Sequence, residues 1–200
     1  MKKLRLTAVV AMLAIVTAVS AQTSLGIKGG VNYSNILGGN ASDLYEAKIG
    51  FNAGLAADFN FAPEMAIQTG LFFTTKGANF KNTDNASIDL MYLQVPVHFA
   101  YKVSVTPGTR VVLHAGPYAA YGVSGKAKSG DTSVDLFKEY TFLGQSYSAF
   151  DRFDAGVGLG VGAEFGQFLV DIGWDMGLVK LNKNSDWKNM SAALSVGYKF

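Results

Sequence analysis

The chain has 200 residues, which is enough for one domain, and it has no cysteine, which excludes disulfides and thiolate metal sites. A formal net charge of +2 argues against a nucleic-acid-binding surface, and 16% charged residues is well below the roughly 25% of an ordinary soluble domain. Beyond the N-terminal segment, no apolar run reaches the ~18 residues that a membrane-spanning helix needs. The apolar residues of this chain must therefore follow another pattern.

The N-terminus has the features of an export signal. Lys2, Lys3 and Arg5 precede an apolar stretch over residues 6–19, and Val19-Ser20-Ala21 supplies the small residues that a signal peptidase reads. We predict a signal peptide over residues 1–21 and a mature domain over residues 22–200. An uncleaved anchor helix is the alternative.

Alternation of apolar and polar or small residues organises the mature chain. From Met190 to Phe200 every second residue is apolar, which is the period of a β-strand with one apolar face and one polar face. Each such stretch has about ten residues or slightly more, the length of a tilted strand that crosses a bilayer. Eight stretches follow this pattern: 24–33, 50–61, 65–75, 93–102, 110–124, 152–165, 168–178 and 188–200.

The connections between these stretches alternate in length. Short ones fall near 62–64, 103–109 and 166–167, and long ones at 34–49, 76–89, 125–150 and 179–187. Short turns on one side and long loops on the other are typical of outer-membrane barrels. We therefore predict an all-β fold: an eight-stranded antiparallel up-and-down transmembrane β-barrel in the cell outer membrane, with its long loops outside.

Aromatic residues mark the predicted periplasmic ends of the strands. Rings at the membrane interface form girdles around such barrels. The predicted girdle, on the lipid-facing side, consists of Phe61, Tyr101, Phe165, Phe168, Tyr198 and Phe200.

Several motifs resemble those of the PorT-type outer-membrane β-barrel proteins of the Bacteroidetes. These are Tyr92-Leu93-Gln94-Val95-Pro96-Val97, Ala115-Gly116-Pro117-Tyr118, Phe153-Asp154-Ala155-Gly156, Trp174-Asp175-Met176-Gly177-Leu178 and the terminal Gly197-Tyr198-Lys199-Phe200. The resemblance covers essentially the whole mature chain, and it implies the barrel but no particular activity. It also implies that Leu194, Val196, Tyr198 and Phe200 are the signal read by the barrel assembly machinery.

Polar residues of both signs fall on the predicted inward face. The interior of eight strands is just wide enough to be filled by side chains, and buried charges must be paired. We therefore expect a plugged lumen and not an open porin, with Asp154 and Asp171 as neighbours that share Arg152, Lys102 or Lys199. The predicted lumen network is Lys28, Asp58, His98, Lys102, Arg110, His114, Arg152, Asp154, Glu164, Asp171, Asp175 and Lys199.

Glycines and prolines need separate explanations. Gly156, Gly158, Gly160 and Gly162 lack the spacing of a phosphate-binding loop, so we interpret them as inward positions that leave room for larger groups across the barrel. Pro96 and Pro117 lie inside strands, where each removes a ladder donor, so we expect a bulge or a lost bond there.

The sequence does not predict catalysis, a cofactor or a metal. His98 and His114 face inward on adjacent strands, but a metal site needs a third ligand and a deacylase needs a serine and an acid beside a histidine. Ser124 and Ser148 qualify only by residue type. We therefore expect a structural or accessory barrel that contacts outer-membrane lipid and lipopolysaccharide, with residues 125–150 as the surface for a protein partner or ligand. The alternatives are a small enzyme acting on lipid A and a soluble periplasmic lipocalin-like barrel.

Overall fold

The computed structural model describes residues 23–200 except 84, 139, 143–144, 148 and 183–184. The predicted cleavage site after Ala21, and candidate Ser148, lie outside these residues. None of the described helices is long and apolar enough to cross a membrane.

Nearly all of the described chain is β-strand, and the one helix, α2 (Ala41–Leu44), is a single turn. The eight long strands each coincide with one of the predicted alternating stretches, although β9, β10 and β11 are one residue shorter than predicted at one end. The strands are β1 (Thr23–Leu37), β2 (Tyr45–Ala62), β3 (Met65–Phe80), β4 (Ala86–Thr106), β5 (Thr109–Ser129), β6 (Thr132–Asp135), β7 (Tyr140–Phe142), β8 (Gln145–Tyr147), β9 (Phe153–Phe165), β10 (Phe168–Gly177) and β11 (Lys188–Lys199).

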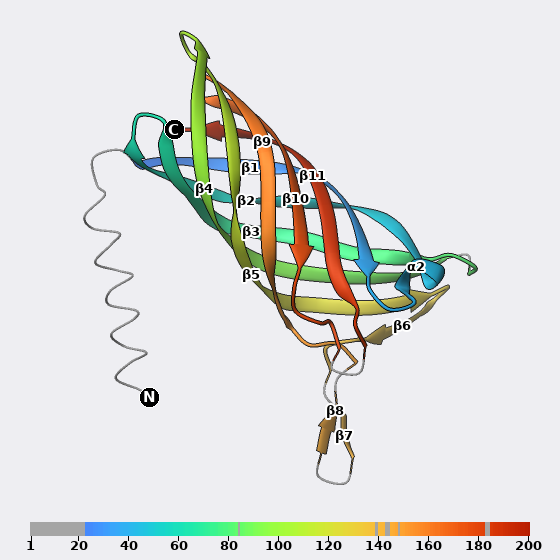
Figure 1. Cartoon of the computed structure of the whole chain (residues 1–200). Helices are drawn as coiled ribbons and strands as arrows, with labels where there is room; N and C mark the ends of the chain where they lie inside the picture. Colours follow the sequence, from blue (N-terminus) through green and yellow to red (C-terminus); the bar gives the residue numbers. More distant parts are fainter. Residues whose placement is uncertain (1–22, 84, 139, 143–144, 148, 183–184) are drawn as a thin grey trace, which may run out of the picture.

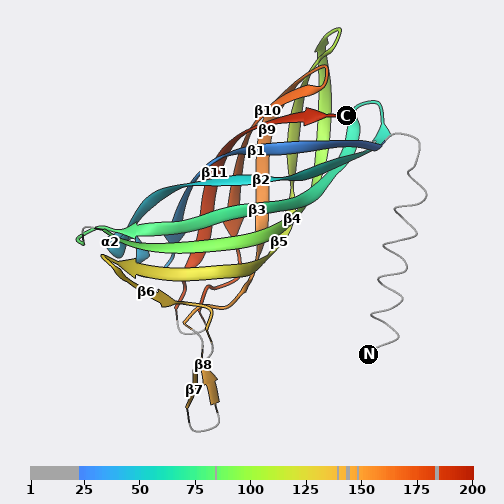
Figure 2. The ribbon, with the colours of Figure 1, turned by 180° about the vertical axis from the view of Figure 1, so that it is seen from behind.

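Eight of these strands close into a barrel (Figures 1 and 2). Each pairs antiparallel with its sequence neighbours, β5 pairs with β9, and β1 pairs with β11 to complete the ring. Strand β6 adds to the edge of β5, and β7 and β8 form a separate hairpin that projects away from the barrel. The predicted eight-stranded up-and-down barrel is therefore confirmed.

The outside of the barrel carries an apolar band. Along β9, Val157, Leu159 and Val161 are 43–52% exposed, while the residues between them face the lumen. All six aromatics of the predicted girdle lie near the end with the short turns, and Phe168 stacks edge-on against Tyr198 with ring centroids 5.2 Å apart. A second set of exposed rings lies toward the other end of the strands: Tyr33, Phe51, Tyr121 and Phe153. Two aromatic belts flanking an apolar band are the expected outer surface of a membrane barrel.

Beyond the second belt the pattern reverses, at the end with the long connections, which we call the outer end. Strand β4 shows this most clearly. Its lumen-facing His98 and Gln94 are followed on the same face by Leu90 and Ile88, both at most 3% exposed. On the opposite face, apolar residues give way to Asp89, which forms an ion pair with Lys48. The outer end thus has an apolar inside and a polar outside, as a water-soluble β-domain has.

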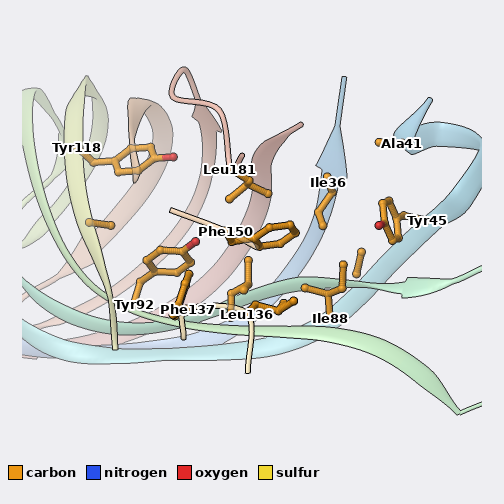
Figure 3. Packing of buried hydrophobic residues seen from close by; sticks show 13 residues of the cluster. Ile36, Ala41, Tyr45, Ile88, Tyr92, Tyr118, Leu136, Phe137, Phe150 and Leu181 are labelled. Atoms are coloured by element: carbon orange, nitrogen blue, oxygen red, sulfur yellow. The ribbon is translucent and has the colours of Figure 1, made fainter. Parts of the chain in front are cut away.

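This apolar inside is closed over by the outer connections. Leu136 and Phe137, which follow β6, and Phe150 and Leu181 pack against the inner faces of the strands (Figure 3). Trp187 packs against the cluster with its ring edge-on to Tyr45, at 5.4 Å between centroids. We call the buried set the apolar cap: Ile36, Ala41, Tyr45, Ala78, Ile88, Leu90, Tyr92, Tyr118, Ala120, Leu136, Phe137, Phe150 and Leu181.

The predicted connections need one correction, whereas the expectation for the two in-strand prolines is met. The loops predicted at 34–49 and 76–89 are shorter, because the strands continue to Leu37 and Phe80 and resume at Tyr45 and Ala86. Their alternation persists beyond the membrane band with its apolar face turned inward, so these residues lack the lipid-facing pattern that predicts a membrane strand. Near Pro96 and Pro117 the ladders lose pairs, as expected: Val95 and Pro96 have no ladder pair on β3, and Val97 and His98 have none on β5, while the register is unchanged. The register shifts between β4 and β5 lie elsewhere, at Met91/Tyr92 and at Ser104/Thr106.

Candidate functional site: the polar lumen

The lumen contains three layers of charged side chains, and the first lies at the short-turn end. Lys102 and Lys199 each place Nζ near Asp58 Oδ2, at 2.7 and 2.5 Å. Both lysines also pair with Glu164, which accepts a further contact from Arg110 at 2.6 Å. Because Lys102 is only 2% exposed, its charge depends on these carboxylates. We call these five residues the base layer.

The middle layer is a chain of contacts that begins at Lys28. Its Nζ lies 2.5 Å from Asp171 Oδ1, and Asp171 Oδ2 lies 2.7 Å from His114 Nε2. The Nδ1 atoms of His114 and His98 are 3.0 Å apart, and the two rings are stacked at 15°. Further toward the outer end on β4 and β10, the strands that also carry His98 and Asp171, Gln94 Nε2 donates to Asp175 Oδ2 at 2.8 Å.

The third layer lies directly beneath the apolar cap and is fully buried. Lys76 Nζ lies 3.3 Å from Asp154 Oδ2, and both side chains are 1% exposed. The ammonium also lies 4.4 Å from the centre of the Tyr118 ring, within cation–π range. Asn189 Nδ2 donates to Asp154 Oδ2 at 3.0 Å. This layer joins the polar lumen to the cap, because Tyr118 belongs to both.

The inward glycines of β9 make room for these layers. A Cβ on Gly160 would lie 2.5 Å from His114 Nε2, and one on Gly156 would lie 2.8 Å from Tyr118 Cε1. A Cβ on Gly158 would lie 2.9 Å from His98 Nε2. Since real Cβ atoms essentially never come this close, the large side chains of β4 and β5 occupy space that only glycine leaves free. The interpretation of these glycines as space for groups from other strands is thus confirmed.

Between the layers the lumen holds a cavity of about 150 Å³. Its walls include the base layer at Asp58, the middle layer at His114, and polar side chains of β1 and β2 such as Asn32 and Asn52. Two buried acceptors in its lining, His98 Nε2 and Gln94 Oε1, have no hydrogen-bond partner within the described part of the protein. The cavity is therefore polar and has unused hydrogen-bonding capacity.

The structure places the predicted lumen residues inside the barrel, with Arg152 as the exception. Arg110 belongs to the base layer but lies at the rim, with 39% of its side chain exposed. Arg152 precedes β9 at the outer end, where it donates to the carbonyl oxygens of Gly122 and Phe137 and stacks over the Phe137 ring at 5.2 Å. Its predicted place in the lumen network is wrong, because the strand begins only at Phe153.

The predicted pairing of Asp154 with Asp171 is also wrong. The turn at Gly166 and Gln167 sets Phe165 opposite Phe168, so Asp171 lies opposite Gly162. Asp154 lies near the outer end of β9, opposite Ala120 on β5. Three cations were proposed for the pair. Lys102 and Lys199 belong to the base layer, and Arg152 lies at the outer end of the barrel.

The predicted lumen network does not include Lys76, Tyr92, Tyr118 and Asn189, which form the third layer with Asp154. Lys76 falls within the predicted connection 76–89. It nevertheless continues the even-numbered inward positions Gln68, Phe72 and Thr74 of β3, and that parity could have identified it. Phe72 also points inward, and its ring occupies the space above Gly54 and Gly70.

The loop predicted as an interaction surface, residues 125–150, is only partly available. Its first residues belong to β5 and β6, and its Leu136, Phe137 and Phe150 are buried in the apolar cap. Exposed charged groups remain along β5 and β6. They include Lys126, Lys128, Asp131 and Asp135.

The chemistry of the lumen is that of ion pairing. Among the described residues, no serine hydroxyl is hydrogen-bonded to His98 or His114, whose partners are each other and Asp171. Nor do the described residues bring three His, Cys, Asp or Glu side chains together around a common metal position.

Comparison with known proteins identifies the kind of barrel. A family model described as an outer membrane protein beta-barrel domain matches residues 20–183. The chain is similar in structure to Neisserial surface protein A (NspA), with a TM-score of 0.55 and 12% identity over 90% of this chain and 99% of that one. Ail, the attachment invasion locus protein of Yersinia pestis, gives a TM-score of 0.48 with 18% identity over 90% and 99% of the two chains. The outer membrane enzyme PagL gives 0.48 with 12% identity over 88% and 99%. No curated protein sequence matches, and at these identities the structural likenesses show the fold alone.

Proposed function

Because this chain belongs to the outer membrane protein β-barrel domain family and resides in the outer membrane, we propose that it is a closed, non-conducting barrel with a structural or binding role at the cell surface. In this proposal the lumen is a plug, and the outer end supplies the contact surface. The protein carries out no chemistry.

The observation that supports this proposal most directly is the sequence of layers along the lumen. A path from the periplasmic end would cross the base layer, the middle layer and the Lys76–Asp154 layer before it met the apolar cap. The cap side chains are 0–8% exposed. A hydrated ion cannot cross a packed apolar layer without leaving its water behind, which is costly.

The finer assignment is to the PorT-type branch of outer-membrane barrels. It is supported by the Tyr92–Val97 and Gly197–Phe200 motifs. With this assignment, residues 1–21 of the chain serve as the export signal and are removed. Leu194, Val196, Tyr198 and Phe200 then form the segment that the barrel assembly machinery reads, and three of these side chains are at least 50% exposed: Leu194, Val196 and Phe200.

We assign the contact surface to the polar outside of the outer end. There Lys48 and Lys128 both pair with Asp89, Lys128 at 2.9 Å, and Lys126 is exposed nearby on β5. Cations just above the membrane band attract the negative groups of lipid surfaces. Lipopolysaccharide, which surrounds barrels in the outer leaflet, is therefore the partner proposed for these lysines, and a protein partner or ligand would contact residues 125–150.

Planar-bilayer conductance tests the closed lumen. The native barrel should insert without steady open-pore current. A variant in which residues 131–150 are replaced by a short glycine–serine linker loses Leu136, Phe137 and Phe150 from the cap and should show transient openings. Steady current from the native protein would overturn the proposal.

Lipid A analysis tests the absence of chemistry. Cells that produce the native protein and cells that produce His114→Ala should give the same lipid A mass spectrum. A modification present only with the native protein would show that the barrel is an enzyme, and would place His114 in its active site.

A further inference from the structure

We propose that the middle of the lumen holds a binding site for a primary ammonium group, either the free ammonium ion or a small alkylamine. Three acceptor groups form it: the carboxylate of Asp175 on β10, Nε2 of His98 on β4 and Oε1 of Gln94 on β4. The site is separate from the outer contact surface and does not depend on its role.

Two adjacent glycines open a trough between His98 and Asp175. Gly116 on β5 pairs with Gly158 on β9, and Gly158 pairs with Asp175 on β10. A Cβ on Gly158 would lie 2.5 Å from Asp175 Oδ1 and 2.9 Å from His98 Nε2. Both atoms therefore approach one point from opposite sides, although no hydrogen bond or ion pair joins the two side chains in the described part of the chain.

When both imidazoles are neutral, the contacts of the middle layer make His98 Nε2 an acceptor. Asp171, ionised beside Lys28, can only accept, so His114 Nε2 carries the proton of their 2.7 Å contact. In a neutral imidazole the other nitrogen then accepts, so His114 Nδ1 receives the proton of His98 Nδ1. The remaining lone pair of His98 is on Nε2, which is buried and has no partner among the described residues.

Gln94 supplies the third acceptor for a similar reason. Its Nε2 must be the atom that faces Asp175 Oδ2, because a carboxylate accepts and cannot donate. Its Oε1 is then left buried in the cavity lining without a donor in the described structure. The three groups together offer acceptors and no free donor.

Charge balance distinguishes Asp175 from the other lumen carboxylates. Asp58 and Glu164 share Lys102 and Lys199, Asp171 has Lys28, and Asp154 has Lys76. Among the described residues Asp175 has the amide of Gln94 as its partner and no cation within ion-pair distance. A carboxylate in a confined interior is stable when a positive group accompanies it, so its partner should be positively charged.

An ammonium group fits these three features better than a metal ion does. It carries one positive charge and offers several N–H donors to acceptors at about 2.8 Å. A transition metal would need its ligands within about 2.0–2.2 Å, and the described side chains do not gather three His, Cys, Asp or Glu around one point. The cavity of about 150 Å³ admits ammonium or methylammonium, since one water takes about 30 Å³. The apolar cap closes the outer end, so the ammonium group would enter from the periplasmic side, past the base layer, where the side chains of Arg110 and Lys199 are 39% and 12% exposed.

Nuclear magnetic resonance of the histidine rings provides a direct test, because the chain has only 2 histidines. The refolded full-length mature barrel, labelled with ¹⁵N-histidine in detergent micelles, is titrated with methylammonium chloride at about pH 8, where alkylammonium is charged and imidazole neutral. Sodium chloride and tetramethylammonium chloride at the same ionic strength are the controls. We expect a saturable shift of the His98 Nε2 resonance with methylammonium alone, and the same shift with ammonium chloride if the free ion also binds.

Variants locate the site. Asp175→Asn removes the charge and should weaken methylammonium binding about tenfold or more, and Gly158→Ala should abolish it by placing a methyl group between the acceptors. Val157→Ala, on the lipid-facing side of β9 next to Gly158, should bind as the native barrel does. Gel mobility before and after boiling shows that each variant is folded. Equal shifts with sodium, no saturable shift at all (a bridging water only), or unchanged binding in folded Asp175→Asn or Gly158→Ala would each overturn the proposal.

Discussion

Lys76 and Asp154 form an ion pair across the lumen between β3 and β9, with Nζ 3.3 Å from Oδ2 and both side chains 1% exposed. Lys76→Met should destabilise the barrel by about 3–5 kcal/mol, because it leaves a buried carboxylate without its cation. The double variant Lys76→Met/Asp154→Asn should recover much of this loss. Urea unfolding in lipid vesicles, followed by tryptophan fluorescence, measures both.

Lys128 is the matched control for that experiment. It also pairs with an aspartate, Asp89, but 51% of its side chain is exposed, so Lys128→Met should change stability little. If the single and double variants at the buried pair lose equal stability, the pairing of Lys76 with Asp154 is not what holds this layer.

Depth in the membrane should decide the effect of a charge on the lipid face. Leu159 lies midway along the exposed face of β9, and Phe165 lies in the aromatic girdle at its end. Leu159→Arg should cost about 2–4 kcal/mol and Phe165→Arg about 0–1 kcal/mol, because the cost of arginine falls from the bilayer midplane to the interface. Urea unfolding in vesicles gives both values, and a reversed order would contradict this position in the bilayer.

Phe137 should hold the outer connections against the barrel. It is 2% exposed, and its ring fills the space that Gly122 and Gly125 leave. Phe137→Ala should cost about 3–5 kcal/mol and increase protease cleavage within residues 125–150 on intact cells. Val134→Ala, at a position on β6 that is 51% exposed, is the control and should leave cleavage unchanged.

The glycines of β9 should not tolerate even a methyl group. In Gly160→Ala, the new Cβ would lie 2.5 Å from two atoms of the His114 ring and 2.7 Å from the carbonyl oxygen of Ile172. We expect a loss of about 1–3 kcal/mol from overpacking. Gly173→Ala, at the residue paired with Gly160 on β10, meets only an ordinary contact and should not show this loss. Thermal or urea unfolding of the two variants side by side is the measurement.

Export should remove residues 1–21. Mass spectrometry of the protein purified from outer-membrane fractions should give a chain that begins at Gln22. Replacing Ala21 with arginine should retain the precursor, because signal peptidase requires a small residue at that position. A native protein of full mass in the outer membrane would support the alternative of an uncleaved anchor.

The sequence was sufficient to predict the eight strands of the barrel, because a lipid-facing side chain at every second position leaves a clear periodic signal. It was misleading at the outer ends of the strands. There Leu90 and Ile88 keep the alternation, but the apolar residues change faces, so the lipid-facing pattern ends although the strand continues. Lys76 was missed for the same reason.

The polar residues of the lumen could be assigned to a face but not to partners. Parity placed Asp171 and Lys28 inside, but their contact joins β10 to β1 across the lumen, past the intervening β11, and depends on the three-dimensional closure of the barrel. The Asp154–Asp171 pairing was an avoidable error, since the two-residue turn at Gly166 and Gln167 already sets the register of β9 and β10.

The reversal of faces along β4 also fixes how deep the barrel sits. If it sank by two residues toward the periplasm, Asp89 and its lysines would enter the hydrocarbon, which is costly for charged groups. If it rose by the same amount, the aromatic girdle at the short-turn end, which includes Tyr101, would leave the membrane interface. The protein therefore has one favoured height in the bilayer, and its outer end stands at a constant distance above the membrane surface.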